Sequence, residues 1–174
     1  MGTTTMFRQM FGSKLQHPDP EVRRQAIAEL EAGDPRLAEA ATGDDEGVVR
    51  RAALEKVTAL DTLTEVMRKD AESETRAAAR TRLVELLCAP AATDEQAAER
   101  VACLEQVSAD SELIEEVLTG ASSVELRVAA LARVQSPTVI ARVAANDPSG
   151  QLRAAALDRV QDEALLEEIG RAAR

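Results

Sequence analysis

Aromatic side chains are almost absent from this chain of 174 residues, which has two phenylalanines and no tryptophan or tyrosine. Their scarcity argues against an aromatic platform for stacking nucleobases and against an aromatic cage for a cationic ligand. Basic residues are outnumbered, 21 against 31 acidic ones, so the formal net charge is −10. A protein that binds a phosphate backbone usually carries the opposite charge. Nucleic acid is therefore not the favoured partner.

Cysteine and histidine are too few to build a reactive site. The two cysteines, Cys88 and Cys103, form no CxxC motif and have no histidine beside them, and His17 is the only histidine. A zinc site, or a nucleophile paired with histidine, needs more members than this. We therefore predict no catalytic residue, no metal site and no cofactor, and we expect that the chain is not an enzyme.

Long hydrophobic runs are missing as well. No stretch approaches the roughly 20 consecutive apolar residues of a membrane-spanning helix, and no signal-peptide pattern opens the chain. We therefore expect no transmembrane segment and a cytoplasmic location. No window alternates apolar and polar residues with a period of two, so the sequence also predicts no strands.

An internal repeat centred on arginine dominates the sequence. In each copy a small residue follows the arginine by three positions, and a leucine or valine follows it by seven. Successive arginines are 27, 26, 24, 27 and 26 residues apart, which leaves room for two short helices and two turns. The repeat arginines are Arg23, Arg50, Arg76, Arg100, Arg127 and Arg153.

The repeat arginine lies inside the apolar arc of its helix. At about 100° per residue, the positions one before it and three, four and seven after it surround it on the helical wheel. An unpaired guanidinium there would be costly. We therefore expect structural arginines whose heads reach carbonyls or carboxylates of neighbouring turns, with Asp19, Asp45 and Asp147 as the acids. A displayed arginine row that binds phosphate is the alternative.

Helix starts are marked by capping side chains, several of them followed by proline. Proline suits the first helical position because its missing N–H has no partner there in any case. The cap-proline pairs are Asp19-Pro20, Asp34-Pro35, Ser136-Pro137 and Asp147-Pro148. The other expected caps are Asp45, Ser73, Thr93 and Ser123. Shorter helices are expected between the repeat helices, at 35–42, 62–69, 112–119, 137–145 and 163–173.

The motif Asp-Pro-x-Val-Arg-x-x-Ala-(Ile/Leu)-x-x-Leu, which runs from Asp19 to Leu30, resembles the second helix of a short bacterial HEAT repeat. The resemblance covers about 19–174. It implies an α-solenoid whose second helices line an inner face that commonly holds protein partners, and it implies structural roles for the motif Asp and Arg. Residues 6–30 also resemble the start of bacterial proteins in which HEAT-like repeats precede a coiled coil and an uncharacterised domain.

The expected fold is thus all-α, a solenoid of about six repeats and about 11–12 helices. The period fails near 88–94, where a long helix after Arg76 ends before Pro90 and no short helix follows. We expect an N-terminal capping helix or arm at 1–18 and two blocks, 19–89 and 93–174, of one continuous solenoid. The seam is interpreted as a tolerated irregularity, with a binding cleft as the alternative.

The two ends of a repeat array need covers for their apolar faces. At the N-terminus, an apolar face is expected to pack on the first repeat, with a membrane surface or another protein as alternatives. At the C-terminus the last expected short helix lacks a partner, so we expect either self-association there or, preferably, a fragment of a longer protein. The N-terminal face consists of Met6, Phe7, Met10, Phe11 and Leu15.

The predicted function is a non-catalytic protein–protein interaction scaffold or adaptor, part of a larger protein or assembly, with a protein partner of unknown identity. One alternative resembles the HEAT-like DNA glycosylases, and its only support is a set of outward bases. Another resembles the HEAT-like bilin lyases, for which no acid pair or reactive thiol stands out. The outward bases, which are also the candidate partner-facing surface, are Arg24, Arg51, Lys56, Arg82, Arg133 and Arg159.

Overall fold

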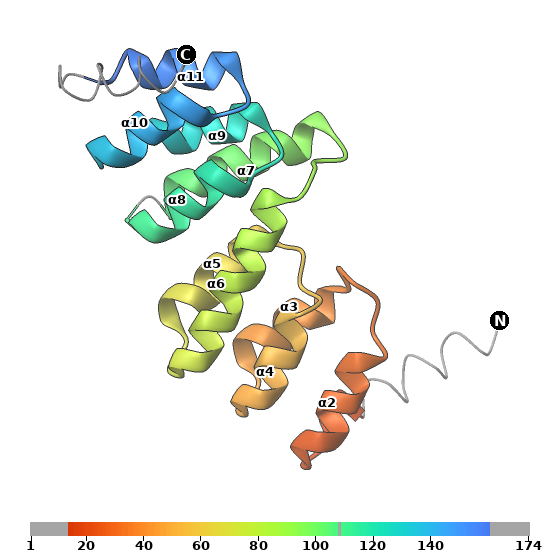
Figure 1. Cartoon of the computed structure of the whole chain (residues 1–174). Coiled ribbons are helices and arrows are strands. Elements are labelled where there is room, and N and C mark those ends of the chain that lie inside the picture. Colours follow the sequence, from red (N-terminus) through yellow and green to blue (C-terminus); the bar gives the residue numbers. More distant parts are fainter. Residues whose placement is uncertain (1–13, 108, 161–174) are drawn as a thin grey trace. The chain divides into compact units, whose positions relative to one another are not determined.

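A computed structural model describes residues 14–107 and 109–160 (Figure 1). Every regular element in these two ranges is an α-helix and no strand occurs in them, which confirms the predicted all-α class. Most of the expected N-terminal arm at 1–18, with four of its five apolar side chains, and the whole expected helix at 163–173 lie outside the described residues.

The helices alternate between the expected short ones and those that carry the repeat arginine. The short helices are α3 (Pro35–Gly43), α5 (Leu60–Lys69), α8 (Ser111–Gly120) and α10 (Pro137–Asn146). The repeat helices are α2 (Pro20–Ala28), α4 (Gly47–Leu54), α6 (Ser73–Cys88), α7 (Asp94–Gln106), α9 (Val124–Leu131) and α11 (Gly150–Leu157).

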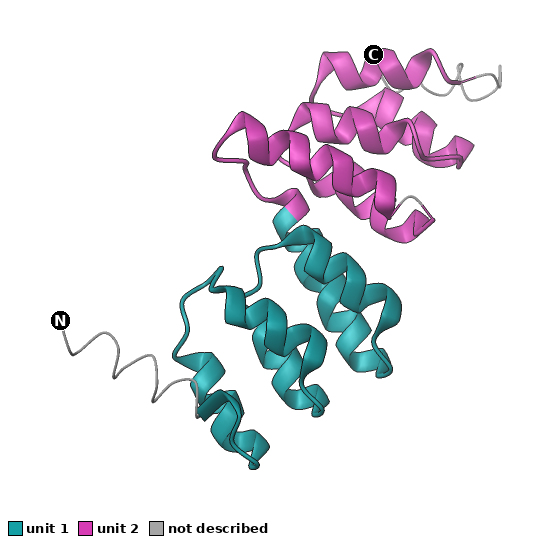
Figure 2. Ribbon diagram, turned by 180° about the vertical axis from the view of Figure 1, so that it is seen from behind, with its two compact units in different colours: residues 1–86 teal, residues 87–174 magenta. Residues whose placement is uncertain are grey.

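The chain divides into two compact units, Met1–Leu86 and Leu87–Arg174 (Figure 2). The division falls inside α6, the longest helix, while the expected blocks were 19–89 and 93–174. As predicted, α6 is followed directly by α7 with no short helix between them. The alternation of short and repeat helices is therefore broken where the sequence period fails.

Helices of the same class pack side by side within each unit. In unit 1, α2 packs against α4 and α3 against α5, while α3 also contacts α4. In unit 2, α9 lies between α7 and α11, and the short helices α8 and α10 pack on α9 and α11 respectively. Within each unit, neighbouring helix pairs thus pack against one another.

A column of small residues lets the repeat helices approach closely. It stands three positions after each repeat arginine, and every member is at most 3% exposed. Its members are Ala26, Ala53, Ala79, Cys103, Ala130 and Ala156. Larger apolar side chains from both helix classes complete the core, among them the fully buried Ile27, Leu54 and Leu63 of unit 1 and Leu113 and Leu126 of unit 2.

Five expected helix caps are confirmed. In each, the side-chain oxygen accepts a hydrogen bond from a backbone N–H two or three residues later, which satisfies a donor that has no partner inside the helix. These caps are Asp19, Asp34, Thr93, Ser123 and Ser136. Pro20, Pro35 and Pro137 open their helices as predicted.

Three expected caps are wrong, because two helices begin one or two residues later, and one helix begins one residue earlier, than the motif suggested. The residue before α4 is Glu46 rather than Asp45, and it makes no capping hydrogen bond. Ser149, not Asp147, caps α11, so Pro148 stands outside that helix. Ser73 is the first residue of α6 rather than the residue before it. Asp147 instead ends α10.

Candidate functional site

The guanidinium groups of three of the six repeat arginines bind aspartates that lie 20 or 21 residues further along the chain. Arg23 donates from Nε and Nη2 to the two carboxylate oxygens of Asp44, at 2.7 and 2.8 Å. Arg50 makes the same fork with Asp70, at 2.7 and 3.0 Å. In unit 2, Arg127 donates from Nη1 to Asp147 at 2.7 Å. We call Asp44, Asp70 and Asp147 the relay aspartates.

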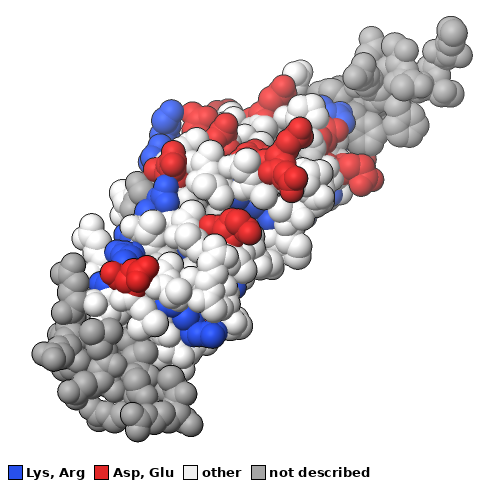
Figure 3. Space-filling view, turned by 90° about the horizontal axis from the view of Figure 1, so that it is seen from above, with Lys and Arg blue, Asp and Glu red and all other residues white. Residues whose placement is uncertain are grey.

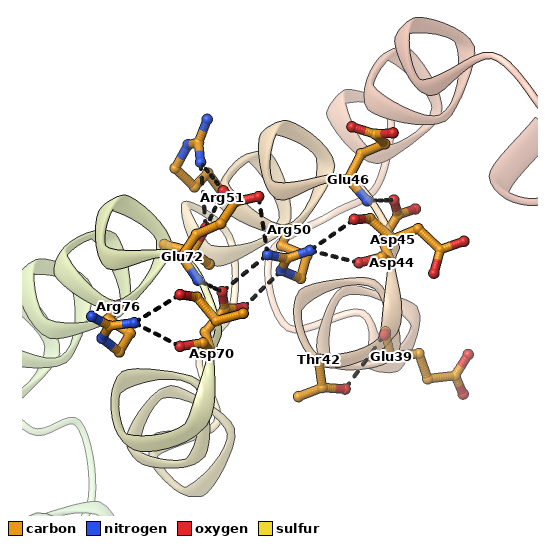
Figure 4. A network of polar contacts seen from close by, with 12 residues as sticks. Glu39, Thr42, Asp44, Asp45, Glu46, Arg50, Arg51, Asp70, Glu72 and Arg76 are labelled. Carbon is orange, nitrogen blue, oxygen red and sulfur yellow. Dashed lines mark hydrogen bonds and ion pairs between the residues drawn. The ribbon is translucent and has the colours of Figure 1, made fainter.

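Each relay aspartate also accepts a hydrogen bond from the following repeat arginine, through its backbone carbonyl. Arg50 donates from Nη1 to the carbonyl of Asp44 at 2.8 Å, and Arg76 donates in the same way to Asp70 at 2.8 Å (Figure 4). Arg153 donates to the carbonyl of Asp147 at 2.7 Å. One aspartate thus joins two arginines, one by its side chain and one by its main chain.

The position of the relay aspartates at helix ends explains this double role. Asp44, Asp70 and Asp147 are the residues that terminate α3, α5 and α10, all with extended backbone angles. Their carboxylates also accept the backbone N–H two residues later, at 2.8–2.9 Å. This local bond fixes the turn into the next repeat helix, and with it the direction of the carboxylate.

The ion pairs are largely shielded from water. The Asp44 and Asp70 side chains are 9% and 7% exposed. Burial raises the pKa of both carboxyls, but their hydrogen bonds to arginine and to backbone N–H groups outweigh it, so the net pKa lies below the ordinary value. The same pairing raises the pKa of Arg23 and Arg50. Both partners therefore stay charged at neutral pH.

Two of the three expected acid partners are wrong. Asp19 caps α2 by accepting the N–H of Glu21 at 2.9 Å, and Asp45 offers Arg50 only its backbone carbonyl, at 3.2 Å. Asp147 does pair with an arginine, as expected. The expected acids stand at the start of the repeat helix, whereas the acid that pairs stands 20 or 21 residues after its arginine, at the end of the short helix.

The relay, by which we mean the series of repeat arginines joined by relay aspartates, is incomplete in unit 2. Arg100 donates to the backbone carbonyls of Ala89 and Pro90, and the position 21 residues after it is Ala121 rather than an aspartate. Arg127 leaves its buried Nε without a hydrogen-bond partner in the part of the chain that is described. Among the described residues, the two-nitrogen fork that Arg23 and Arg50 make with an aspartate is thus absent from Arg100 and Arg127.

Four of the six outward bases bind inside the fold. Lys56 donates to the carbonyls of Ala28 and Leu30 at the end of α2, Arg82 to that of Val57 at 3.2 Å, and Arg159 to those near the end of α9. Arg133 donates to a carbonyl of its own helix and pairs with Glu105 of α7 at 3.4 Å. These cations thus supply hydrogen-bond donors to carbonyls at or near helix C-termini, where backbone acceptors commonly lack an intrahelical partner.

The other two outward bases, Arg24 and Arg51, line a groove between α2 and α4. It has a volume of about 320 Å³, and we call it the α2–α4 groove. Val48 stands in it with 47% of its surface exposed, although large apolar residues elsewhere in the described chain are mostly buried. The groove is lined by Arg24, Ile27, Ala28, Val48, Arg51, Ala52, Glu55 and Lys56.

A glutamate from the start of the next repeat helix fixes Arg51 at the groove. The carboxylate of Glu72 accepts from Arg51 Nη1 at 2.9 Å and lies 3.5 Å from Arg50 Nη2 (Figure 4). It occupies the space beside Gly47, where an added Cβ would stand 1.8 Å from a carboxylate oxygen. The buried Thr75 accepts from Arg51 as well, at 3.3 Å. Arg51 is therefore held by α6 while its helix lines the groove.

Other kinds of site find little support in the described residues. There, no group of histidine, cysteine, aspartate and glutamate could hold a metal ion, and no helix is long and apolar enough to cross a membrane. Cys103 is buried, and burial raises the pKa of the half-buried Cys88 thiol. Figure 3 shows acidic and basic groups interspersed with uncharged surface on one face. Comparison of the chain with family models, curated proteins and solved structures gave no match.

The contacts of the relay aspartates predict that Asp44 and its neighbour Asp45 contribute very differently to the free energy of unfolding. Asp44→Asn should lower the free energy of unfolding by about 1–3 kcal/mol, because it leaves the Arg23 guanidinium, whose side chain is only 12% exposed, without a charged partner. Asp45→Asn, a control one residue away with an exposed side chain, should change it by less than about 0.5 kcal/mol. Urea denaturation of the two variants and the native chain measures the difference.

The pH dependence of the stability loss caused by Asp44→Asn provides a control. Because the pKa of Asp44 is lowered in the folded chain, its contribution to stability is present above the unfolded pKa of about 3.9 and fades as the pH falls through the folded value. The gap between the native chain and the variant should narrow in acid. Equal losses for Asp44→Asn and Asp45→Asn, or a gap independent of pH, would contradict the relay.

Ala121 is the position where a relay aspartate can be added. Its backbone angles, φ −68° and ψ 137°, match those of Asp44, −71° and 137°. Ala121→Asp should give Arg100 the carboxylate that it lacks and raise the free energy of unfolding by about 1 kcal/mol. Ala121→Asn is the matched uncharged control in urea denaturation. A variant with aspartate that is less stable than the one with asparagine would refute the equivalence of the two positions.

Proposed function

We propose that the chain is a non-catalytic protein-interaction scaffold made of HEAT-like repeats that stack as an α-solenoid. The repeated helix pairs, the stacking of like helices and the relay aspartates that join one repeat to the next support this architecture. A bacterial origin, a cytoplasmic location and membership of a larger assembly are parts of the same proposal. The resemblance to HEAT repeats is their only support.

The single observation that carries the proposal is the exposed Val48 in the α2–α4 groove. The groove lies on the repeat helices, which the HEAT resemblance assigns to the partner-binding face. An exposed aliphatic side chain with small neighbours, Ala28 and Ala52, and a charged rim has the composition of a protein contact: an apolar centre inside a polar edge. Such a surface offers contact area without any reactive group.

The nucleic-acid alternative loses most of its support. It relied on six outward bases, but Lys56, Arg82, Arg133 and Arg159 bind carbonyls or a glutamate inside the fold. Arg24 and Arg51 lie at an exposed groove together with Lys56, and both arginines are paired with glutamates. Phosphate binding needs several cations in a row, so a protein partner is the better proposal.

Site-specific crosslinking tests this function. A photoreactive amino acid at Val48 of the full chain, irradiated in an extract of the source cells, should give a discrete protein adduct. The same amino acid at Lys69, whose side chain is 73% exposed on α5, is the control and should not give that adduct. Adducts with nucleic acid alone, identical adducts at both positions, or none at Val48 would contradict the proposal.

A further inference from the structure

We propose that the α2–α4 groove binds an acidic peptide segment that places one short apolar side chain between its carboxylates. This inference rests on the protein-interaction function proposed above and names the class of partner. The hydrogen-bond donors that the groove leaves available, its apolar floor and the charges around it support this class of partner.

The charged lining of the groove holds more donors than the fold uses. Arg24 binds Glu21 through Nε and Nη2, at 2.8 and 2.7 Å, and its Nη1 has no hydrogen bond within the described residues. The Lys56 ammonium has three N–H donors, of which two go to the carbonyls of Ala28 and Leu30. Glu55 supplies the only carboxylate of the lining. The groove therefore favours a partner rich in acceptors.

Arg24 can exchange Glu21 for another carboxylate with little loss of folding stability. Arg24 and Glu21 are one helical turn apart on α2, and their side chains are 47% and 54% exposed. Water screens such pairs, so they add little to stability. A carboxylate of a bound segment can replace Glu21 or bind the remaining Nη1 beside it. Arg51, at the same position of the next repeat, offers the second cation of the groove.

The floor between these cations accepts a short aliphatic side chain. Ile27, Ala28, Val48 and Ala52 form it, and the volume of about 320 Å³ suits one or two side chains rather than a folded surface. A partner valine or alanine would cover Val48, and its flanking carboxylates would reach Arg24 on α2 and Arg51 on α4. The segment thus lies across the two repeat helices.

Acidic side chains around the groove limit how much negative charge it accepts. Glu21, Glu72 and Glu74 pair with Arg24 and Arg51 from outside the lining, and the whole chain carries a net charge of −10. A long phosphate backbone would meet further acidic side chains outside the groove, whereas a short peptide with two or three acids meets only the carboxylates that already pair with Arg24 and Arg51. We therefore favour an acidic peptide over a nucleic acid.

Fluorescence anisotropy with defined probes tests the inference on the full chain. The probes are a labelled peptide with a central valine flanked by aspartates, the same peptide with lysines in place of aspartates, and a single-stranded oligonucleotide. The aspartate peptide should bind, and more weakly as salt rises. Arg24→Glu should weaken its binding by at least about tenfold, because the reversed charge repels the peptide.

Two further variants keep the test decisive. Val48→Asp, at a position whose surface is 47% exposed, should reduce binding as strongly as Arg24→Glu. Lys69→Glu makes the same change of net charge on α5, outside the groove, and should leave affinity unchanged. Circular dichroism verifies that each variant is folded.

The inference is overturned if the lysine peptide or the oligonucleotide binds as well as the aspartate peptide, if no probe binds, or if Lys69→Glu weakens binding as much as Arg24→Glu. Crosslinking at Val48 separates the two proposals. A protein adduct at Val48 together with no aspartate-peptide binding refutes the acidic partner and leaves the interaction function standing, whereas the loss of both refutes both.

Discussion

The fold depends on an aspartate at the end of a short helix that serves two arginines at once. Its carboxylate accepts the guanidinium of the preceding repeat, and its carbonyl accepts that of the following one. Asp44 and Asp70 both have this arrangement in successive repeats, so Arg50 binds the carbonyl of Asp44 and the carboxylate of Asp70. Loss of one such aspartate therefore removes contacts from two repeats. The short helices are thus connected by ion pairs and hydrogen bonds as well as by apolar contacts.

Such a connection matters because the helices are short. Most have eight to ten residues, a length at which an isolated helix is barely stable in water. The small-residue column brings the repeat helices close together, and bases such as Lys56 and Arg159 bind the free carbonyls at the ends of their neighbours. Most cations of the repeat helices thus serve the fold, and the α2–α4 groove is where two of them meet an exposed apolar side chain.

The helix class and the repeat could be predicted from the sequence, because spacing fixes which side chains share a face. The caps at Asp19, Thr93 and Ser123 followed from local chemistry alone. The sequence predicts Asp147 as an acid partner, but not Asp44: Asp44 and Asp45 are adjacent, and only the exact end of α3 decides which one turns inward. Likewise, the column that contains Lys56 and Arg82 looks solvent-facing on a helical wheel, and only a neighbouring helix end shows what it binds. The groove depends on that same packing, so Val48 gave no signal in the sequence.

A double-mutant cycle between Arg23 and Asp44 measures the central interaction most directly. The free energies of unfolding of Arg23→Gln, Asp44→Asn and the double variant, compared with that of the native chain, give the coupling between the two side chains. The relay predicts a coupling of about 1 kcal/mol or more, in line with contacting charged pairs. Additive losses, with a coupling below about 0.3 kcal/mol, would show that the two groups are neighbours without being partners.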